Sequence, residues 1–168
     1  MDEQKKAVAS LKALDRRFVK GGFSMHVGEL ALGEILGYGS TGEVQAGVFE
    51  GCDAAFKMLL IDSHEESYGA LERLINERDV YSKELAQLQG SLVPQLLGHG
   101  LVEGHFGQVA HTIVLTRIKG TVLNDMDVTP ELEAAALRVL EQVHKAGVLH
   151  NDPRALNFIC TTSGPAGD

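Results

Sequence analysis

Residues 148–159 read Val-Leu-His-Asn-Asp-Pro-Arg-Ala-Leu-Asn-Phe-Ile, and this stretch decides how the rest of the chain is interpreted. Its polar residues form the pattern His-x-Asp-x-x-x-x-Asn between apolar flanks. The Asp152 carboxylate and the Asn157 carboxamide therefore stand five residues apart on one predicted loop. At that spacing the carboxylate can receive a proton from a hydroxyl group, while the amide oxygen can ligate a phosphate-bound Mg²⁺.

The composition limits the classes of protein to which the chain can belong. Its 168 residues are enough for one buried core or for two small lobes. A content of 44% hydrophobic and 23% charged residues is ordinary for a globular protein. The net charge of −8 argues against a general role at nucleic acids or membrane surfaces. We therefore expect partners that are neither nucleic acids nor membranes.

Cysteine and histidine usage gives no sign of a disulfide framework or a metal centre. Cys52 and Cys160 are far apart and show no pairing pattern, so we expect free thiols in a reducing compartment. His99, His105 and His111 recur every sixth residue but lack the short ligand spacing of zinc sites. With no secretory signal and no apolar run of transmembrane length, we expect a cytoplasmic or other intracellular location.

Hydrophobic periodicity and turn residues predict the order of the elements. We expect a helix, three strands, a second helix, two strands and a third helix before the Asp152 loop. A Ser-x-x-Glu capping box at Ser63 predicts the start of the second helix, and Thr129 before Pro130 predicts the start of the third. Segment 23–27 is expected to be a connector. The expected strands are 30–37, 43–49, 52–60, 95–102 and 109–118, and the expected helices are 3–20, 63 towards 90, and 130 to about 146.

A glycine pattern lies between the first two expected strands. Residues 36–44 contain G-x-G-x-x-G-x-V, formed by Gly37, Gly39, Gly42 and Val44. Glycines let a backbone fold over a triphosphate and present N–H groups to it, because no Cβ stands in the way. The same glycine spacing also marks Rossmann dinucleotide sites, but there the loop opens a helix, whereas residues 43–49 read as a strand. An ordinary hairpin turn remains the alternative interpretation.

Taken together in this order, the glycine pattern, the strand Ala54-Ala55-Phe56-Lys57-Met58 and the Asp152 loop resemble the eukaryotic-type protein kinases. Lys57 stands where the family has the lysine of V-A-I-K, which contacts the α- and β-phosphates of ATP and pairs with a helix glutamate. The segment from Asn76 to Gly90 resembles a Glu-x-x-x-Tyr, Leu-x-x-Leu-Gln-Gly pattern of a divergent kinase group. We therefore expect Glu77 to be the partner of Lys57, with Glu72 as the alternative.

The resemblance also implies roles for residues around the hinge and the loop. Leu115 would be the gatekeeper, and the Thr116 carbonyl and the Ile118 N–H would face the adenine edge. Asp152 would be the catalytic base and Asn157 a ligand of Mg²⁺. The site would also include His150, as a structural member of the loop. Asn151 stands where the family usually has an arginine, which is a departure from its pattern.

The fold class implied by the resemblance is α+β and protein kinase-like. We expect a five-stranded antiparallel N-lobe sheet with one helix, followed by the beginning of a helical C-lobe. The expected parts are a helical extension at 1–22, the N-lobe at 23–118, a partial C-lobe at 119–160 and a disordered tail at 161–168.

The implied function is transfer of a phosphoryl group from ATP, with Mg²⁺, to a Ser/Thr hydroxyl of a protein substrate. The chain stops eleven residues past Asn157 and no Asp-Phe-Gly follows, which indicates an incomplete kinase domain. Two alternatives remain open. One is a small-molecule kinase of the aminoglycoside or choline type, which shares the Asp152 pattern. The other is an inactive nucleotide-binding pseudokinase module.

Overall fold

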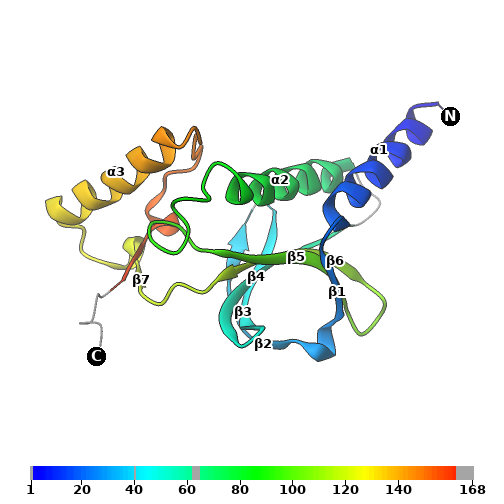
Figure 1. Ribbon diagram of the computed structural model, residues 1–168, viewed down its shortest axis with the longest axis horizontal. Helices are drawn as coiled ribbons and strands as arrows, with labels where there is room; N and C mark the ends of the chain where they lie inside the picture. Colours follow the sequence, from blue (N-terminus) through cyan, green and yellow to red (C-terminus); the bar gives the residue numbers. More distant parts are fainter. Residues whose placement is uncertain (1, 40, 62–64, 162–168) are drawn as a thin grey trace. The chain divides into compact units, whose positions relative to one another are not determined.

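The computed structural model describes residues 2–39, 41–61 and 65–161. The chain divides into two compact units, and Figure 1 shows their helices and strands. The first unit contains residues 1–82 and 95–117, and the second contains residues 83–94 and 118–168. Both helices and strands are present, so the expected α+β class is confirmed. Among the described residues, no helix is both long and apolar enough to cross a membrane.

The first unit is built on a six-stranded mixed sheet with the order β1-β5-β6-β4-β3-β2. Its centre is the apolar strand β6, which lies between β4 and β5 and has Ile113 and Val114 completely buried. Glu50 and Gly51, both with positive φ, make the tight turn from β3 to β4. The six strands are β1 (Phe23–His26), β2 (Ala31–Gly39), β3 (Gly42–Phe49), β4 (Cys52–Leu60), β5 (Leu96–Glu103) and β6 (Val109–Thr116).

The expected five-stranded antiparallel sheet is wrong in two respects. Residues 23–26, interpreted as a connector, form the additional strand β1, and β1 pairs with β5 in parallel. Glycine makes this pairing possible, because a Cβ at Gly100 would collide with the backbone and ring of Phe23. A Cβ at Gly22 would lie 2.7 Å from the carbonyl oxygen of His99. Because Gly22 and Gly100 have no Cβ, the backbones of β1 and β5 can lie closer together than they could with larger residues at these positions.

Apolar side chains pack on both faces of this sheet. Helices α1 (Asp2–Val19) and α2 (Glu65–Ser82) contribute to one cluster, in which Phe18, Leu74 and Ile113 are fully or almost fully buried. Phe56 and Val114 belong to a second cluster on the opposite face, since successive strand residues alternate between faces. The second cluster is formed almost entirely by side chains of the strands themselves, so the central strands carry buried apolar residues on both sides.

Helix α2 is shorter than expected. The predicted N-cap, Ser63, lies outside the described residues, and the helix ends at Ser82 instead of continuing towards Gly90. Ser82 Oγ donates a hydrogen bond to the Arg78 carbonyl oxygen at 2.8 Å, which competes with the helical bonding pattern. Residues 83–93 then form turns, with the Leu88 carbonyl accepting from Leu92 N–H at 2.9 Å.

The second unit contains one long helix and short elements. Thr129 Oγ1 accepts a hydrogen bond from Leu132 N–H at 3.4 Å and Pro130 opens the helix α3 (Pro130–Lys145), as predicted. Gly147, at φ 88°, follows its end. The predicted disorder of the tail concerns residues that, after Thr161, lie outside the described chain. The remaining elements are β7 (Thr121–Val122), η2 (Leu123–Asp125), η3 (Ala155–Asn157) and β8 (Ile159–Cys160), and β7 pairs with β8.

Candidate active site

The glycine pattern forms the hairpin between β2 and β3, in which Gly37 pairs with Val44 and Gly39 with Gly42. Gly42 has φ 131°, and a Cβ there would overlap the carbonyl group of Met58 on β4. Gly37 has open space where a Cβ would stand. A Cβ at Gly39 would lie 3.9 Å from Lys57 Cε. The last glycine therefore permits a close backbone approach, and the hairpin lies beside the side chain of Lys57.

Thr41, next to Gly42, is a feature that the sequence did not single out. It is 4% exposed, and its Oγ1 has no hydrogen-bond partner in the described part of the chain. A buried hydroxyl without a partner is unfavourable by about 1–3 kcal/mol. An unpartnered buried group of this kind often marks a loop with a binding role. The sequence does not reveal that Thr41 is buried, so sequence reasoning could not have identified this hydroxyl group.

Lys57 and Glu77 form an ion pair within the first unit. Strand β4 places Lys57 opposite Val44 in the register with β3, on the face that Leu59 shares and where α2 packs. Lys57 Nζ lies 2.6 Å from Glu77 Oε2, and their side chains are only 19% and 27% exposed. Glu72, the alternative partner, is exposed. Of the two glutamates considered, the structure brings Glu77 to Lys57.

The predicted adenine-binding residues fall in different units. Leu115 and Thr116 end β6 in the first unit, where the Thr116 N–H donates to the Gln95 carbonyl oxygen at 2.8 Å. Thr116 Oγ1 accepts from the Gln95 N–H at 2.9 Å, so this end of the strand is firmly bonded. Ile118 belongs to the second unit.

The second unit brings Asp152 and Asn157 together on one loop. Asn157 Nδ2 donates to the Asp152 backbone carbonyl at 2.7 Å and to its carboxylate Oδ2 at 3.2 Å. The ring of His150 stacks with that of Phe158, with centroids 6.3 Å apart and planes inclined by 16°. Asn151 has φ 56°, a left-handed conformation that asparagine tolerates better than most residues. The loop turns at Asn151, and its two ends are joined across the turn.

Arg154 binds the Asp152 carboxylate, a contact that the sequence analysis did not predict. Its Nε lies 2.5 Å from Oδ1 and its Nη2 lies 2.8 Å from Oδ2. The hydrogen bonds from Arg154 hold the pKa of Asp152 below its ordinary value and outweigh the opposing effect of burial; the hydrogen bond from Asn157 makes a smaller contribution to the lowering. The carboxylate is therefore ionised at neutral pH with both oxygens engaged. The spacing of two residues between Asp152 and Arg154 was a signal that could have revealed this pair.

Mg²⁺ is implied by the resemblance, but the described side chains do not form a site for it by themselves. The amide nitrogen of Asn157 is bonded to Asp152, which leaves its oxygen as the atom able to ligate a cation. Mg²⁺ requires near-octahedral oxygen coordination, usually with carboxylates and substrate phosphates. No group of three or more His, Cys, Asp or Glu residues in the described chain could hold a metal ion.

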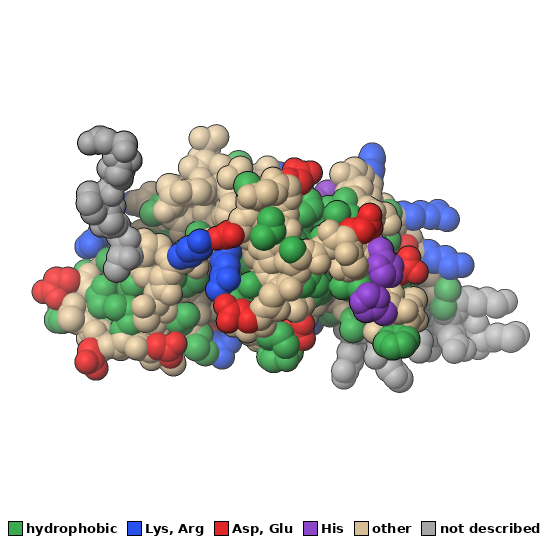
Figure 2. Space-filling model, turned by 90° about the horizontal axis from the view of Figure 1, so that it is seen from below, with side chains coloured by type: hydrophobic (Ala, Val, Ile, Leu, Met, Phe, Trp, Pro, Cys, Tyr) green, Lys and Arg blue, Asp and Glu red, His purple; other side chains and the backbone are tan. Residues whose placement is uncertain are grey.

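The histidines of the described segments provide no such group either. Figure 2 shows two histidine side chains next to each other on the surface, and His26 and His105, with ring centroids 5.3 Å apart, form a pair of this kind. His26 Nδ1 already accepts a hydrogen bond from Gly28 N–H at 3.0 Å. Two imidazoles are fewer ligands than a protein metal site normally supplies.

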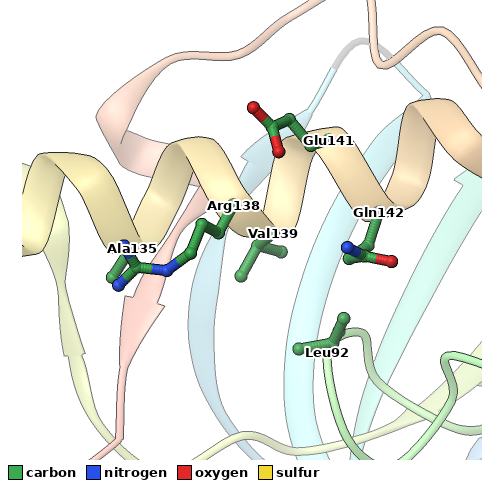
Figure 3. Close-up of a pocket in the computed structure, with 6 residues that line it drawn as sticks. All are labelled: Leu92, Ala135, Arg138, Val139, Glu141 and Gln142. Carbon is green, nitrogen blue, oxygen red and sulfur yellow. The ribbon is translucent and has the colours of Figure 1, made fainter.

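An open hollow in the second unit lies along α3 (Figure 3). Val139 and Gln142 point towards Leu92, whereas Glu141 points away from it. None of its lining residues belongs to the predicted site, so we assign it no part in the chemistry. The lining residues are Leu92, Ala135, Arg138, Val139, Glu141 and Gln142.

No protein-family model matches the chain. No curated protein matches it at a significant level of similarity.

Proposed function

We propose that the chain carries the nucleotide-binding and loop residues of a phosphotransferase that uses ATP and transfers a phosphoryl group to a Ser/Thr hydroxyl of a protein. The observation that carries this proposal is the ion pair between Lys57 and Glu77, which lies beside the glycine hairpin. A lysine restrained by a carboxylate under a glycine-rich loop is an arrangement suited to binding polyphosphates.

The first unit would bind the phosphates of ATP. Glu77 restrains the Lys57 ammonium group, so little side-chain freedom remains to be lost when phosphate binds. The hairpin can present backbone N–H groups because Gly37 and Gly39 carry no Cβ. The buried hydroxyl of Thr41 is a further donor at the same loop. These groups fit a polyphosphate ligand.

The second unit would act on the hydroxyl that accepts the phosphoryl group. Asp152 would orient this hydroxyl and receive its proton, and Asn157 holds the Asp152 backbone in place. Arg154 must first release at least one carboxylate oxygen. The Arg154 guanidinium group would release the carboxylate if it bound the negatively charged phosphoryl group instead, because a guanidinium group binds both anions with two parallel hydrogen bonds. Mg²⁺ accompanies ATP in such reactions, but we assign it no step.

ATP binding by the chain tests the first half of the proposal. We expect saturable binding of a fluorescent ATP analogue, and a loss of affinity of about tenfold or more in Lys57→Met. Lys12→Met, a matched change at an exposed lysine of α1, should bind like the wild type. Circular dichroism would establish that both variants are folded. Absence of wild-type binding, or equal affinity in Lys57→Met, would refute the assignment of Lys57.

The acceptor is tested by following transfer of the γ-phosphate from ATP by the protein. Labelling of a Ser/Thr-containing protein substrate, abolished in Asp152→Asn, is the expected result. Labelling of an aminoglycoside or choline instead would favour a small-molecule kinase. ATP binding without any transfer would favour the pseudokinase interpretation, for which the engaged state of the Asp152 carboxylate is the specific observation.

A further inference from the structure

Helix α1 is part of the core of the first unit and is not merely attached to its surface. Phe18, in its last turn, is completely buried and packs in one cluster with Leu74 of α2 and Ile113 of β6. On the sheet side, His111 Nε2 lies 2.7 Å from Asp15 Oδ1. Helix α1 is therefore held by both α2 and the sheet.

The C-terminal end of α1 is bonded by a side chain of α2. A helix leaves its last carbonyl groups without partners inside the helix, and partial negative charge collects there. Arg78 Nη1 donates to the carbonyl oxygens of Phe18 at 3.0 Å and of Arg17 at 3.2 Å. The same guanidinium group lies 5.6 Å from the centre of the Phe18 ring. Arg78 therefore satisfies two of the carbonyl groups that end α1.

The remaining donors of Arg78 extend this contact into a network. Its Nε and Nη2 donate to Asp79 Oδ1 at 2.9 and 2.6 Å. Asp79 Oδ2 in turn accepts from Arg17 Nη2 at 2.5 Å. The arginines beside Asp79 lower the pKa of its carboxyl group in spite of the opposing effect of burial, which is the largest single influence on it. The carboxylate is thus charged between two arginines, one from each helix.

Three consecutive residues of α2 therefore make contacts with two different elements, the strand β4 and the end of α1. Glu77 binds Lys57 of β4, and Arg78 and Asp79 bind the end of α1. We propose that α1 is a latch for α2, and that Arg78 is the positioning residue through which the latch keeps Glu77 against Lys57. A role of this latch in phosphoryl transfer rests on the proposed function. The hold on the ion pair is a property of the fold alone.

A double-mutant cycle separates positioning from general stabilisation. The unfolding equilibrium constants of Lys57→Met, Glu77→Gln and the double variant give the coupling between the two side chains. This cycle would be repeated in backgrounds that carry Arg78→Lys, which keeps the charge but loses the planar fork, or Arg17→Met. Arg16→Met, at an exposed arginine of the same helix, is the matched control. Fluorescent ATP-analogue binding would be measured for each background.

In the wild-type and Arg16→Met backgrounds, we expect the coupling between Lys57 and Glu77 to change the unfolding equilibrium constant by about fivefold or more. In the Arg78→Lys and Arg17→Met backgrounds, we expect this coupling to be less than about twofold. A purely structural role of Arg78 would lower overall stability and leave the coupling unchanged, which would overturn the latch. If Arg78→Lys does not fold, the Arg17→Met background decides whether the latch exists. The Arg17 side chain is 58% exposed, so its replacement should lower the overall stability only slightly. If the wild type binds no nucleotide, the proposed function fails, while the coupling still decides the latch.

Discussion

Replacement of Gly42 by alanine tests whether the last glycine of the hairpin is required by the sheet itself. Gly42 has φ 131°, a conformation in which a residue with a Cβ is strained by about 1–3 kcal/mol. The new Cβ would also overlap the Met58 carbonyl group, and forcing strands apart costs about 1–3 kcal/mol more. The reduced entropy of the unfolded chain offsets about 0.4–1 kcal/mol. These contributions sum to a net loss of about 1–5.6 kcal/mol of stability, with a central expectation of about 3 kcal/mol.

Two other glycines of the same sheet are the controls. Gly51, at φ 81°, has no neighbour within 4 Å of a Cβ, so Gly51→Ala should cost only the backbone strain of about 1 kcal/mol. Gly37 has equally open space and no positive φ, so Gly37→Ala should change stability by less than about 0.5 kcal/mol. Urea unfolding followed by circular dichroism measures all three. If Gly42→Ala and Gly51→Ala lost the same stability, the argument from the Met58 contact would be refuted.

Three further changes test the second unit. Thr129→Ala should destabilise α3 by about 1 kcal/mol through loss of its N-cap, with Thr129→Ser as the control, measured by thermal unfolding. Asn151→Val should cost about 1–2 kcal/mol and Asn151→Gly much less in the same assay, because φ is 56°. Arg154→Gln should raise the pKa of Asp152 towards its usual value of about 3.9 in an NMR titration. The stability that this pair provides is present above that pH and is lost as the pH falls through the lowered pKa, so the variant should match the wild type in strong acid.

The elements that the sequence predicted well are those with local signals. The strand boundaries of the glycine hairpin and the start of α3 follow from turn residues, a cap and apolar periodicity, all of which act over a few residues. The preference for Glu77 over Glu72 came from a short sequence pattern, and Glu77 is the one that meets Lys57. The local pattern around Asp152 also predicted one loop for Asp152 and Asn157, and the two residues are hydrogen-bonded there.

Contacts between distant segments could not be predicted in the same way. Strand β1 pairs with β5 because Gly22 and Gly100 lack side chains, and nothing within either segment indicates the other. The contacts of Arg78 with the end of α1 join residues separated by 60 or 61 positions. A charged residue such as Arg78 is expected at the surface by its type, so its burial becomes evident only when both helices are placed.

The ion pair of the first unit and that of the second unit differ in exposure, and this difference agrees with the different tasks that we propose for them. The side chains of Lys57 and Glu77 are 19% and 27% exposed, so water screens their attraction poorly and the pair is expected to be rigid. Those of Arg154 and Asp152 are 68% and 47% exposed, where water and salt screen an ion pair and either partner can be exchanged easily. A lysine that orients phosphates has to stay in place, whereas a base has to release its partner before it can accept a proton. Under the proposed function, the rigid pair would contain the residue that binds ATP, and the exchangeable pair would contain the residue that receives the proton.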